Sequence, residues 1–131
     1  MSDLPSQPAR NVFGEPLVPC SFAPMTGYFR DGCCRTDLGD HGTHVVCAVM
    51  TDAFLAFSRA RGNDLSTPQL AWRFPGLHAG DQWCLCINRW KEAFLADAAP
   101  LVVLESTNQL ALQVIDLAVL QRYAYSTEAS A

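Results

Sequence analysis

A short segment from Asp31 to Cys47, DGCCRTDLGDHGTHVVC, carries three cysteines and two histidines. Thiolates and imidazoles bind zinc or copper(I), and a thiolate next to a histidine can act as a nucleophile. Further cysteines lie at Cys20, in a proline-rich stretch, and in the Cys84-x-Cys86 pair. These residue types allow three interpretations: a metal site, a thiol catalyst, or small sulfur side chains that pack in a core.

The spacing of the candidate metal ligands differs from that of a zinc knuckle. Structural zinc takes four Cys or His ligands, commonly offered as pairs separated by two to four residues. Cysteines 33 and 34 are adjacent, whereas 84 and 86 are separated by one residue. A site would therefore need residues that the fold brings together, with the histidine on a turn before the strand. The candidate ligands are Cys33, His44, Cys47 and Cys86, and soft thiolates favour zinc or copper(I) as the cofactor.

Thiol catalysis needs a cysteine whose pKa is lowered by a cation, a histidine or a helix N-terminus. Cys34 lies between Arg30 and Arg35 in the sequence, and Cys84 shortly precedes an expected helix. We therefore take Cys34 and Cys84 as candidate nucleophiles and His44 as the candidate proton carrier. Reduced cysteine is also among the most buried residue types, so separate packing of each sulfur is slightly favoured over one combined site.

Charged side chains near the sulfurs predict a polar ligand-binding site. Binding residues usually gather on loops around a sheet. Six charged residues lie in expected loops or at strand ends: Arg30, Asp31, Arg35, Asp64, Asp81 and Arg89. The alternative for Asp31 and Asp64 is that their carboxylates accept backbone hydrogen bonds within turns.

The elements that would position these residues alternate along the chain. Residues 43–50 are β-branched and predict a buried strand, and a helix over 52–61 follows the capping residue Thr51. A second strand over 82–88 leads into a helix in RWKEAFLADA. PLVVLES then predicts a third strand, followed by two short helices.

This order predicts an α+β fold. We expect a small mixed sheet of three or more strands with helices packed on it as a two-layer sandwich. Crossover helices between strands favour some parallel pairing, and a small three-layer α/β fold is the alternative. Residues 11–35 are rich in Gly and Pro and predict an irregular N-terminal arm. The long loop GNDLSTPQLAWRFPGLHAGD is of a length that is often functional.

The length of 131 residues predicts one domain at 11–125, between disordered tails at 1–10 and 126–131. A net charge of −4 without a basic cluster argues against a nucleic-acid partner. The apolar runs are too short for a membrane span, and the first ten residues do not fit a signal peptide. We therefore expect a cytoplasmic protein whose cysteines are reduced, with no membrane partner.

Six sequence blocks resemble those of the domain-of-unknown-function family 2237, a small bacterial and eukaryotic family. The blocks run in the same order from about Asn11 to Tyr123: NVFGEPLVPCS, PMTGYFRDGCCR, HVVCAVMT, SRARGNDLSTP, FPGLHAGDQWCLC and RWKEA. The resemblance implies a compact single-domain protein with helices and strands. The family is defined by sequence and fold and not by an established reaction.

The leading hypothesis is a Cys/His-lined pocket for a small ligand or metal ion, formed by the arm and the strand ends. One alternative is a non-catalytic protein-interaction domain with buried structural cysteines, and a second is a thiol-dependent enzyme. A homo-oligomer stays open, because a second subunit could cover an arm rich in Phe and Pro.

Overall fold

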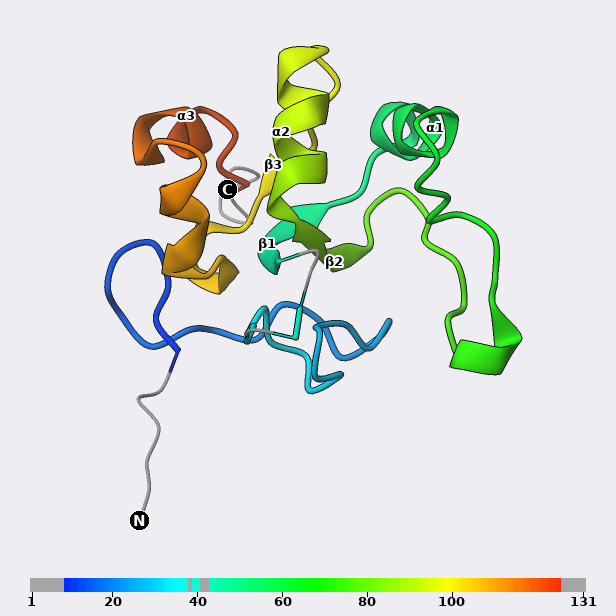
Figure 1. Cartoon of the computed structure of the whole chain (residues 1–131), viewed down its shortest axis with the longest axis horizontal. Coiled ribbons are helices and arrows are strands. Elements are labelled where there is room, and N and C mark those ends of the chain that lie inside the picture. The colour runs from blue at the N-terminus through cyan, green and yellow to red at the C-terminus, as the bar shows by residue number, and fades with distance from the viewer. Residues whose placement is uncertain (1–8, 38, 41–42, 126–131) are drawn as a thin grey trace, which may run out of the picture.

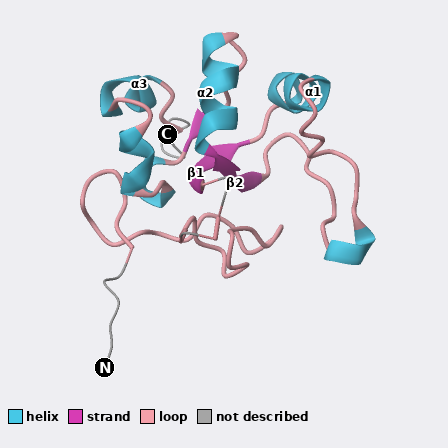
Figure 2. Cartoon of the chain, viewed as in Figure 1, coloured by secondary structure: helices cyan, strands magenta, loops and turns pink. Residues whose placement is uncertain are grey.

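The computed structural model describes residues 9–37, 39–40 and 43–125 (Figure 1). Helices and strands alternate in the predicted order (Figure 2). They are β1 (His44–Val49), α1 (Asp52–Ala60), β2 (Gln82–Cys86), α2 (Ile87–Leu95), β3 (Leu101–Val102) and α3 (Leu117–Arg122). The described residues also form three 3₁₀ helices: η1 (Leu70–Trp72), η2 (Leu104–Ser106) and η3 (Gln109–Gln113).

The three strands form a sheet in the order β2-β1-β3, and β1 is antiparallel to both neighbours. The predicted α+β class is therefore confirmed, while the strand pairing differs from the expected mixed sheet. The α2 crossover does connect two strands of the same direction, β2 and β3. However, β1 lies between them, so parallel strands are not hydrogen-bonded neighbours. A parallel pair occurs instead at the isolated bridge Val102–Ala124.

Helices cover one face of the sheet, and the irregular N-terminal arm, residues 9–37, covers the other (Figure 1). The side-chain core divides in the same way. A large cluster includes Val46, Phe54, Leu85 and Trp90. A small second cluster consists of four cysteines and a valine, Cys20, Cys34, Cys47, Cys84 and Val103. The sulfur-bearing residues thus form the layer between the sheet and the arm.

Helix α1 begins where the sequence predicts. The Thr51 hydroxyl accepts a hydrogen bond from the Phe54 backbone N–H at 3.0 Å, which satisfies a donor left free at the helix start. Phe54 and Leu55 are buried against the core, and the Ser58 hydroxyl donates to the Asn63 carbonyl at 2.7 Å. This last bond fixes the direction in which the chain leaves the helix.

Strand β2 runs directly into α2, so the predicted strand over 82–88 ends two residues early. Ile87 is the first helical residue, and its N–H donates to the Thr43 carbonyl at 3.2 Å. The buried Trp90 anchors α2, because its indole N–H donates to the Pro100 carbonyl at 3.1 Å and its ring stacks on Phe94. The end of β2 and the start of α2 are therefore held beside Thr43, the residue before β1.

The third predicted strand is paired only at Leu101–Val102. The chain then turns through η2 and rejoins β1 further on. There the Thr107 hydroxyl accepts from the Cys47 N–H at 3.2 Å, and the Asn108 N–H donates to the Val45 carbonyl at 2.9 Å. The Thr107 side chain thus takes the place of a backbone acceptor from a neighbouring strand. Hydrophobic alternation in the sequence does not indicate this replacement.

The predicted tails lie mainly outside the described residues, at 1–8 and 126–131. Ala9 and Arg10 belong to the folded part, because their carbonyls accept hydrogen bonds from the backbone of Leu17 and Gln109. No helix within the described ranges is both long and apolar enough to cross a membrane.

Candidate functional site

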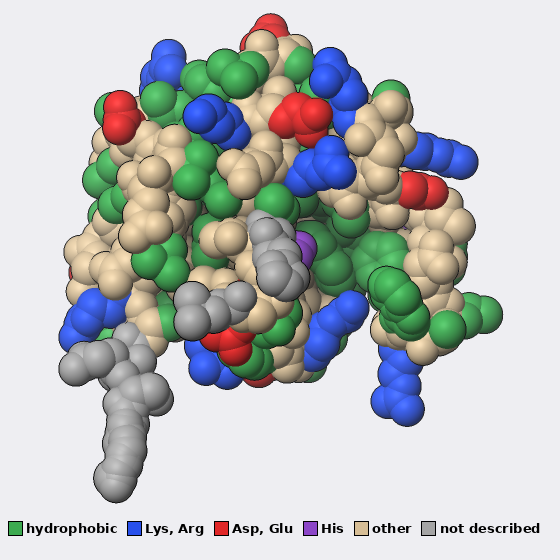
Figure 3. Space-filling model, viewed as in Figure 1, with side chains coloured by type: hydrophobic (Ala, Val, Ile, Leu, Met, Phe, Trp, Pro, Cys, Tyr) green, Lys and Arg blue, Asp and Glu red, His purple; other side chains and the backbone are tan. Residues whose placement is uncertain are grey.

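A cavity of about 390 Å³ opens between the arm, the start of β1, strand β2 and the loop after α1. Figure 3 shows hydrophobic side chains gathered in this hollow beside a histidine and a cationic side chain. Aromatic rings form much of the wall. The lining residues are Gly27, Tyr28, Arg30, His44, Asp64, Leu65, Gln69, Trp72, Phe74, Trp83 and Cys84.

The orientation of the His44 side chain in the cavity is set by Asp40. Its Nδ1 lies 2.6 Å from Oδ1 of Asp40, and its backbone N–H donates to Oδ2 of the same carboxylate at 2.9 Å. The Asp40 side chain is 1% exposed, whereas that of His44 is 41% exposed. Because a carboxylate only accepts hydrogen bonds, the Nδ1 atom carries the proton and Nε2 is left available to a ligand.

Asp40 is suited to hold this imidazole because it stays ionised. Burial raises the pKa of its carboxyl, but hydrogen bonds from the His44 backbone, the His44 ring and the Thr36 hydroxyl outweigh it. The net result is a pKa below the usual value for aspartate. A charged, buried acceptor therefore stands behind the exposed ring.

Arg30 supplies a positive charge to the cavity. Its guanidinium carbon lies 5.7 Å from the centre of the Trp83 ring, a cation–π arrangement. Its backbone has a φ of 55°, which is uncommon for a residue with a side chain, and Thr43 beside His44 has a φ of 49°. Two left-handed residues thus present Arg30 and His44 to the same space.

Gly27 allows two segments of the arm, at Gly27 and Cys33, to pack closely against each other. With φ at 101°, it occupies a conformation that favours glycine, and an added Cβ would collide with the Cys33 carbonyl oxygen. The next residue back, Thr26, is fully buried, and its hydroxyl accepts from the Cys84 N–H at 2.9 Å. The cavity wall at Cys84 is therefore built from strand and arm together.

Asp64 lines the cavity, but its carboxylate is engaged in its own turn. It accepts from the N–H groups of Ser66 and Thr67 and from the Thr67 hydroxyl, the last at 2.7 Å. Hydrogen bonding by Thr67 is the main reason why the pKa of Asp64 is lowered. The turn alternative therefore describes Asp64, which shapes the loop that carries Trp72.

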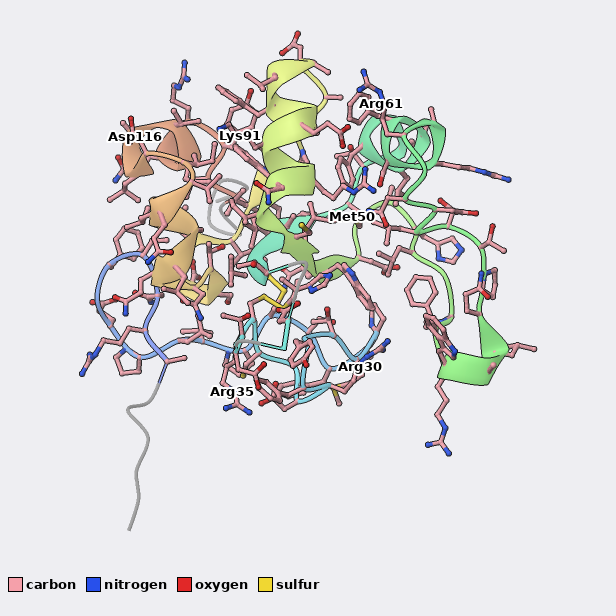
Figure 4. All side chains as sticks on the ribbon, viewed as in Figure 1. Arg30, Arg35, Met50, Arg61, Lys91 and Asp116 are labelled. Carbon is pink, nitrogen blue, oxygen red and sulfur yellow. A yellow bond between two sulfur atoms is a disulfide. The ribbon has the colours of Figure 1, made fainter. Side chains whose placement is uncertain are left out.

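The structure corrects the expectation that the cysteines are reduced. Cys20 is bonded to Cys47, and Cys34 is bonded to Cys84. Figure 4 shows the sulfur bonds where the strands meet the arm. The candidate nucleophiles Cys34 and Cys84 are thus partners of each other, and neither offers a free thiolate. The sequence spacing gives no sign of this pairing, because the bonded residues lie 27 and 50 positions apart.

Cys33 and Cys86 are the free cysteines, and both are half-buried. Burial is the main cause that raises the pKa of the Cys33 thiol, and the negative charge of Asp31 adds to it. Arg35 acts in the opposite direction but does not prevail. The nearby Arg35 therefore does not bring the pKa of the Cys33 thiol below its usual value.

The predicted metal ligands Cys33, His44, Cys47 and Cys86 are not brought together. Cys86 does lie opposite His44 across β1 and β2, but Cys47 is bonded to Cys20, and Cys33 borders a different hollow beside Arg35. Within the described part of the chain, the group of potential ligand atoms close to one another is that of Cys20, Cys34 and Cys47.

The six predicted ligand-binding residues likewise do not form one site. Arg30 and Asp64 reach the cavity, whereas Arg35 pairs with Asp31 on another part of the arm, with Nη2 2.6 Å from Oδ2. Figure 4 shows Arg30 and Arg35 on opposite sides of the arm. Asp81 accepts from the His78 N–H in the turn before β2, and Arg89 pairs with Glu92 on α2.

Several cavity residues were not among the predicted site residues. The aromatic side chains Trp72 and Phe74 come from the long loop, whose length was the available signal. Asp40, four residues before His44, is not in the cavity lining, and spacing alone does not define its buried contact with the ring.

One family matches almost the whole folded part of the chain. Residues 10–124 match the family described as "Uncharacterized protein conserved in bacteria (DUF2237)". No curated protein matches the chain. The match covers the arm, the sheet, the helices and every residue of the cavity, so the chain belongs to the DUF2237 family.

Proposed function

We propose that this protein binds a small molecule with an aromatic body and an anionic group in the cavity described above. The observation that carries the proposal is the position of His44. Its ring is held by the buried Asp40 and borders the same cavity as the Arg30 guanidinium. We also propose a cytoplasmic location, in which the two disulfides would have to form against a reducing environment.

The aromatic preference follows from the wall. Trp72, Phe74, Trp83 and Tyr28 line the cavity, and Phe74 packs edge-on against Trp83 with ring centres 5.2 Å apart. Pockets lined by aromatic side chains favour flat apolar ligands that stack against them. Trp72 is 77% exposed, so much of its ring is open to a ligand that enters the cavity.

The anionic preference follows from the polar groups. Arg30 is a permanent cation in the wall, and its guanidinium can donate two parallel hydrogen bonds to a carboxylate, sulfonate or phosphate. Protonated His44 donates from Nε2, while neutral His44 accepts there. The Asp40–His44 pair can therefore bind an acidic group or exchange a proton with the ligand.

A titration with 1-anilinonaphthalene-8-sulfonate tests the proposal, because this dye combines aromatic rings with an anionic group. The wild-type protein should bind the dye with saturation, and Arg30→Gln should weaken binding about tenfold, or about 1.4 kcal/mol. Trp72→Ala should weaken it as well, since the ring contributes stacking area.

Two matched variants serve as controls. Arg35→Gln removes an arginine of the same arm outside the cavity, and Leu95→Ala removes an exposed leucine on α2. Both should leave the dissociation constant unchanged. Equal losses in Arg30→Gln and Arg35→Gln would mean that general surface charge binds the dye, and the proposal would be wrong.

A further inference from the structure

Four cysteine sulfurs from three segments meet in the layer between the sheet and the arm. The Sγ atoms of Cys20, Cys34 and Cys47 all lie within 4.8 Å of one another, and Cys84 joins them through its bond to Cys34. We propose that the reduced protein binds one Zn²⁺ ion with the thiolates of these four residues. This site shares Cys84 with the lining of the small-molecule cavity, but zinc binding does not require a ligand there.

The backbone spacing suits a tetrahedral zinc site. Zinc–sulfur bonds of about 2.3 Å place the four sulfurs of a tetrahedron about 3.8 Å apart. Three of the sulfurs already lie within 4.8 Å of one another. The Cα atoms lie 5.7 Å apart for Cys20 and Cys47, and 5.2 Å apart for Cys34 and Cys84. Rotation of the four side chains can therefore open a central position while the backbone stays in place.

The backbone of each cysteine is also held by something other than a disulfide. In each case, one of its peptide groups forms a hydrogen bond with a side chain from another part of the fold. These bonds are Gln82 Nε2 to the Cys20 carbonyl at 2.6 Å, Asn108 Nδ2 to the Cys34 carbonyl at 3.1 Å, the Cys47 N–H to Thr107 Oγ1 at 3.2 Å, and the Cys84 N–H to Thr26 Oγ1 at 2.9 Å.

Such support of the ligands by surrounding hydrogen bonds is what a metal site requires. Cys47 and Cys84 are in addition direct neighbours across β1 and β2. Loss of the two sulfur–sulfur bonds would therefore leave the four thiols close together. A cluster of four unpaired thiols in a dry core is a high-affinity ligand set for zinc.

The burial of the four cysteines indicates a structural zinc site and not a catalytic one. The four cysteines are at most 4% exposed, so the fourth coordination position is filled by protein and not by water. A zinc ion bound there has no open position and stabilises the fold without acting on a substrate. Cys33 and Cys86 are half-buried and lie outside the cluster, so they are not ligands.

A phosphine can reduce the two disulfides and so supply the four thiols. Each phosphine reduces one disulfide to two thiols, takes an oxygen atom from water and becomes a phosphine oxide. Two phosphines therefore give four thiols. Zn²⁺ then displaces the four thiol protons and forms four zinc–sulfur bonds.

The experiment uses the full chain, unfolded in guanidinium with tris(2-carboxyethyl)phosphine and refolded without oxygen in the presence of Zn²⁺ or Co²⁺. We expect about one metal ion per chain by elemental analysis. The cobalt protein should show the intense visible bands of tetrahedral cobalt and a sulfur-to-cobalt charge-transfer band in the near ultraviolet.

The Cys33→Ser/Cys86→Ser variant is the matched control, because it retains only the four cluster cysteines. It should bind the same amount of metal as the wild type with the same cobalt spectrum. Removing one cluster ligand, as in Cys20→Ser or Cys47→Ser, should weaken the sulfur-to-cobalt charge-transfer band, shift the visible bands and lower the metal content. The wild-type and control spectra test the site even where a cluster variant does not fold.

Two results would overturn the proposal. The first is a reduced protein with native circular dichroism, four reactive thiols in the control variant and no bound metal. The second is loss of the metal in Cys33→Ser/Cys86→Ser while the fold is retained.

Discussion

At the residue scale, Asp40 and Cys33 show how burial and hydrogen bonding compete for the charge of a single side chain. Burial opposes ionisation in both cases. Three hydrogen bonds reverse its effect at Asp40, whereas an adjacent aspartate reinforces it at Cys33. The first residue is therefore held as a negative charge beside the His44 ring, and the second is a thiol with a raised pKa.

Asp40→Asn should lower the free energy of unfolding by about 1–3 kcal/mol at pH 7, because charge-assisted hydrogen bonds to the buried carboxylate are lost. The folded-state pKa of Asp40 lies below its unfolded value, so this stabilisation is present above the unfolded pKa. It should shrink as the pH falls below about 4 and through the lowered folded-state pKa. Urea unfolding between pH 7 and pH 3 measures the difference.

The control for this series is Asp116→Asn, because the Asp116 carboxylate makes no hydrogen bond to the start of α3. Its effect should stay within about 0.5 kcal/mol throughout. A difference between wild type and Asp40→Asn that stays constant down to pH 3 would show that the carboxylate charge is not responsible.

Alkylation of Cys33 tests the electrostatics of the arm. Asp31→Asn removes a negative charge that raises the pKa of the thiol, so iodoacetamide should label Cys33 faster at pH 8. Arg35→Gln removes the opposing positive charge and should slow labelling. Peptide mapping by mass spectrometry gives both rates, with Cys86 as the internal reference. Unchanged rates in both variants would assign the reactivity to burial alone.

Some of the site could be predicted at this scale, and some could not. Residue type and loop placement were enough to nominate Arg30, Asp64 and His44 as candidates, and all three line the cavity. Their roles as ligand contacts stay predictions. The free-thiol roles of Cys34 and Cys84 failed because pairing depends on three-dimensional approach, which neither spacing nor composition encodes.

At the element scale, the sequence predicted the bounds of an element correctly where a capping residue marks its start. Helix α1 has a capping threonine and a buried stripe, and its observed bounds agree with the prediction within one residue. The third strand was predicted too long because the chain turns into η2 at Leu104. Thr107 and Asn108 then resume the contact with β1, the first through its side chain. Hydrophobic alternation cannot detect such a replacement.

Thr51→Ala tests the boundary of α1. Loss of the hydroxyl that accepts the Phe54 N–H should lower the free energy of unfolding by about 1 kcal/mol. Thr51→Ser retains the acceptor oxygen and should recover most of this amount. Both values come from urea unfolding of the oxidised protein. If serine and alanine are equally destabilising, the methyl group of Thr51 matters and the cap does not.

At the scale of the whole molecule, the predicted alternation of strands and helices was sufficient to give the class of fold. The order of strands in the sheet was not predicted, because the long loop allows β2 to return antiparallel beside β1. The arm was predicted as irregular. Its attachment to β1 and β2 through two disulfides became visible only in three dimensions.

The disulfides should dominate the stability of the oxidised, metal-free protein. Chain-entropy estimates for separations of 27 and 50 residues give roughly 3.5 and 4 kcal/mol. We therefore expect Cys20→Ala/Cys47→Ala and Cys34→Ala/Cys84→Ala each to lose about 3–4 kcal/mol in denaturant unfolding with a chelator. Cys33→Ala/Cys86→Ala, which removes no disulfide, should lose far less. A cost below about 1 kcal/mol for either pair would indicate that its bond is not formed in the folded protein.

The two disulfides interleave along the chain, since Cys34 lies inside the first closed loop and Cys84 outside it. A single proteolytic cut anywhere between residues 20 and 84 consequently leaves both fragments covalently joined. The long exposed loop between α1 and β2 could be nicked without loss of mass. Such damage would remain hidden in a denaturing gel until a reductant separates the two pieces.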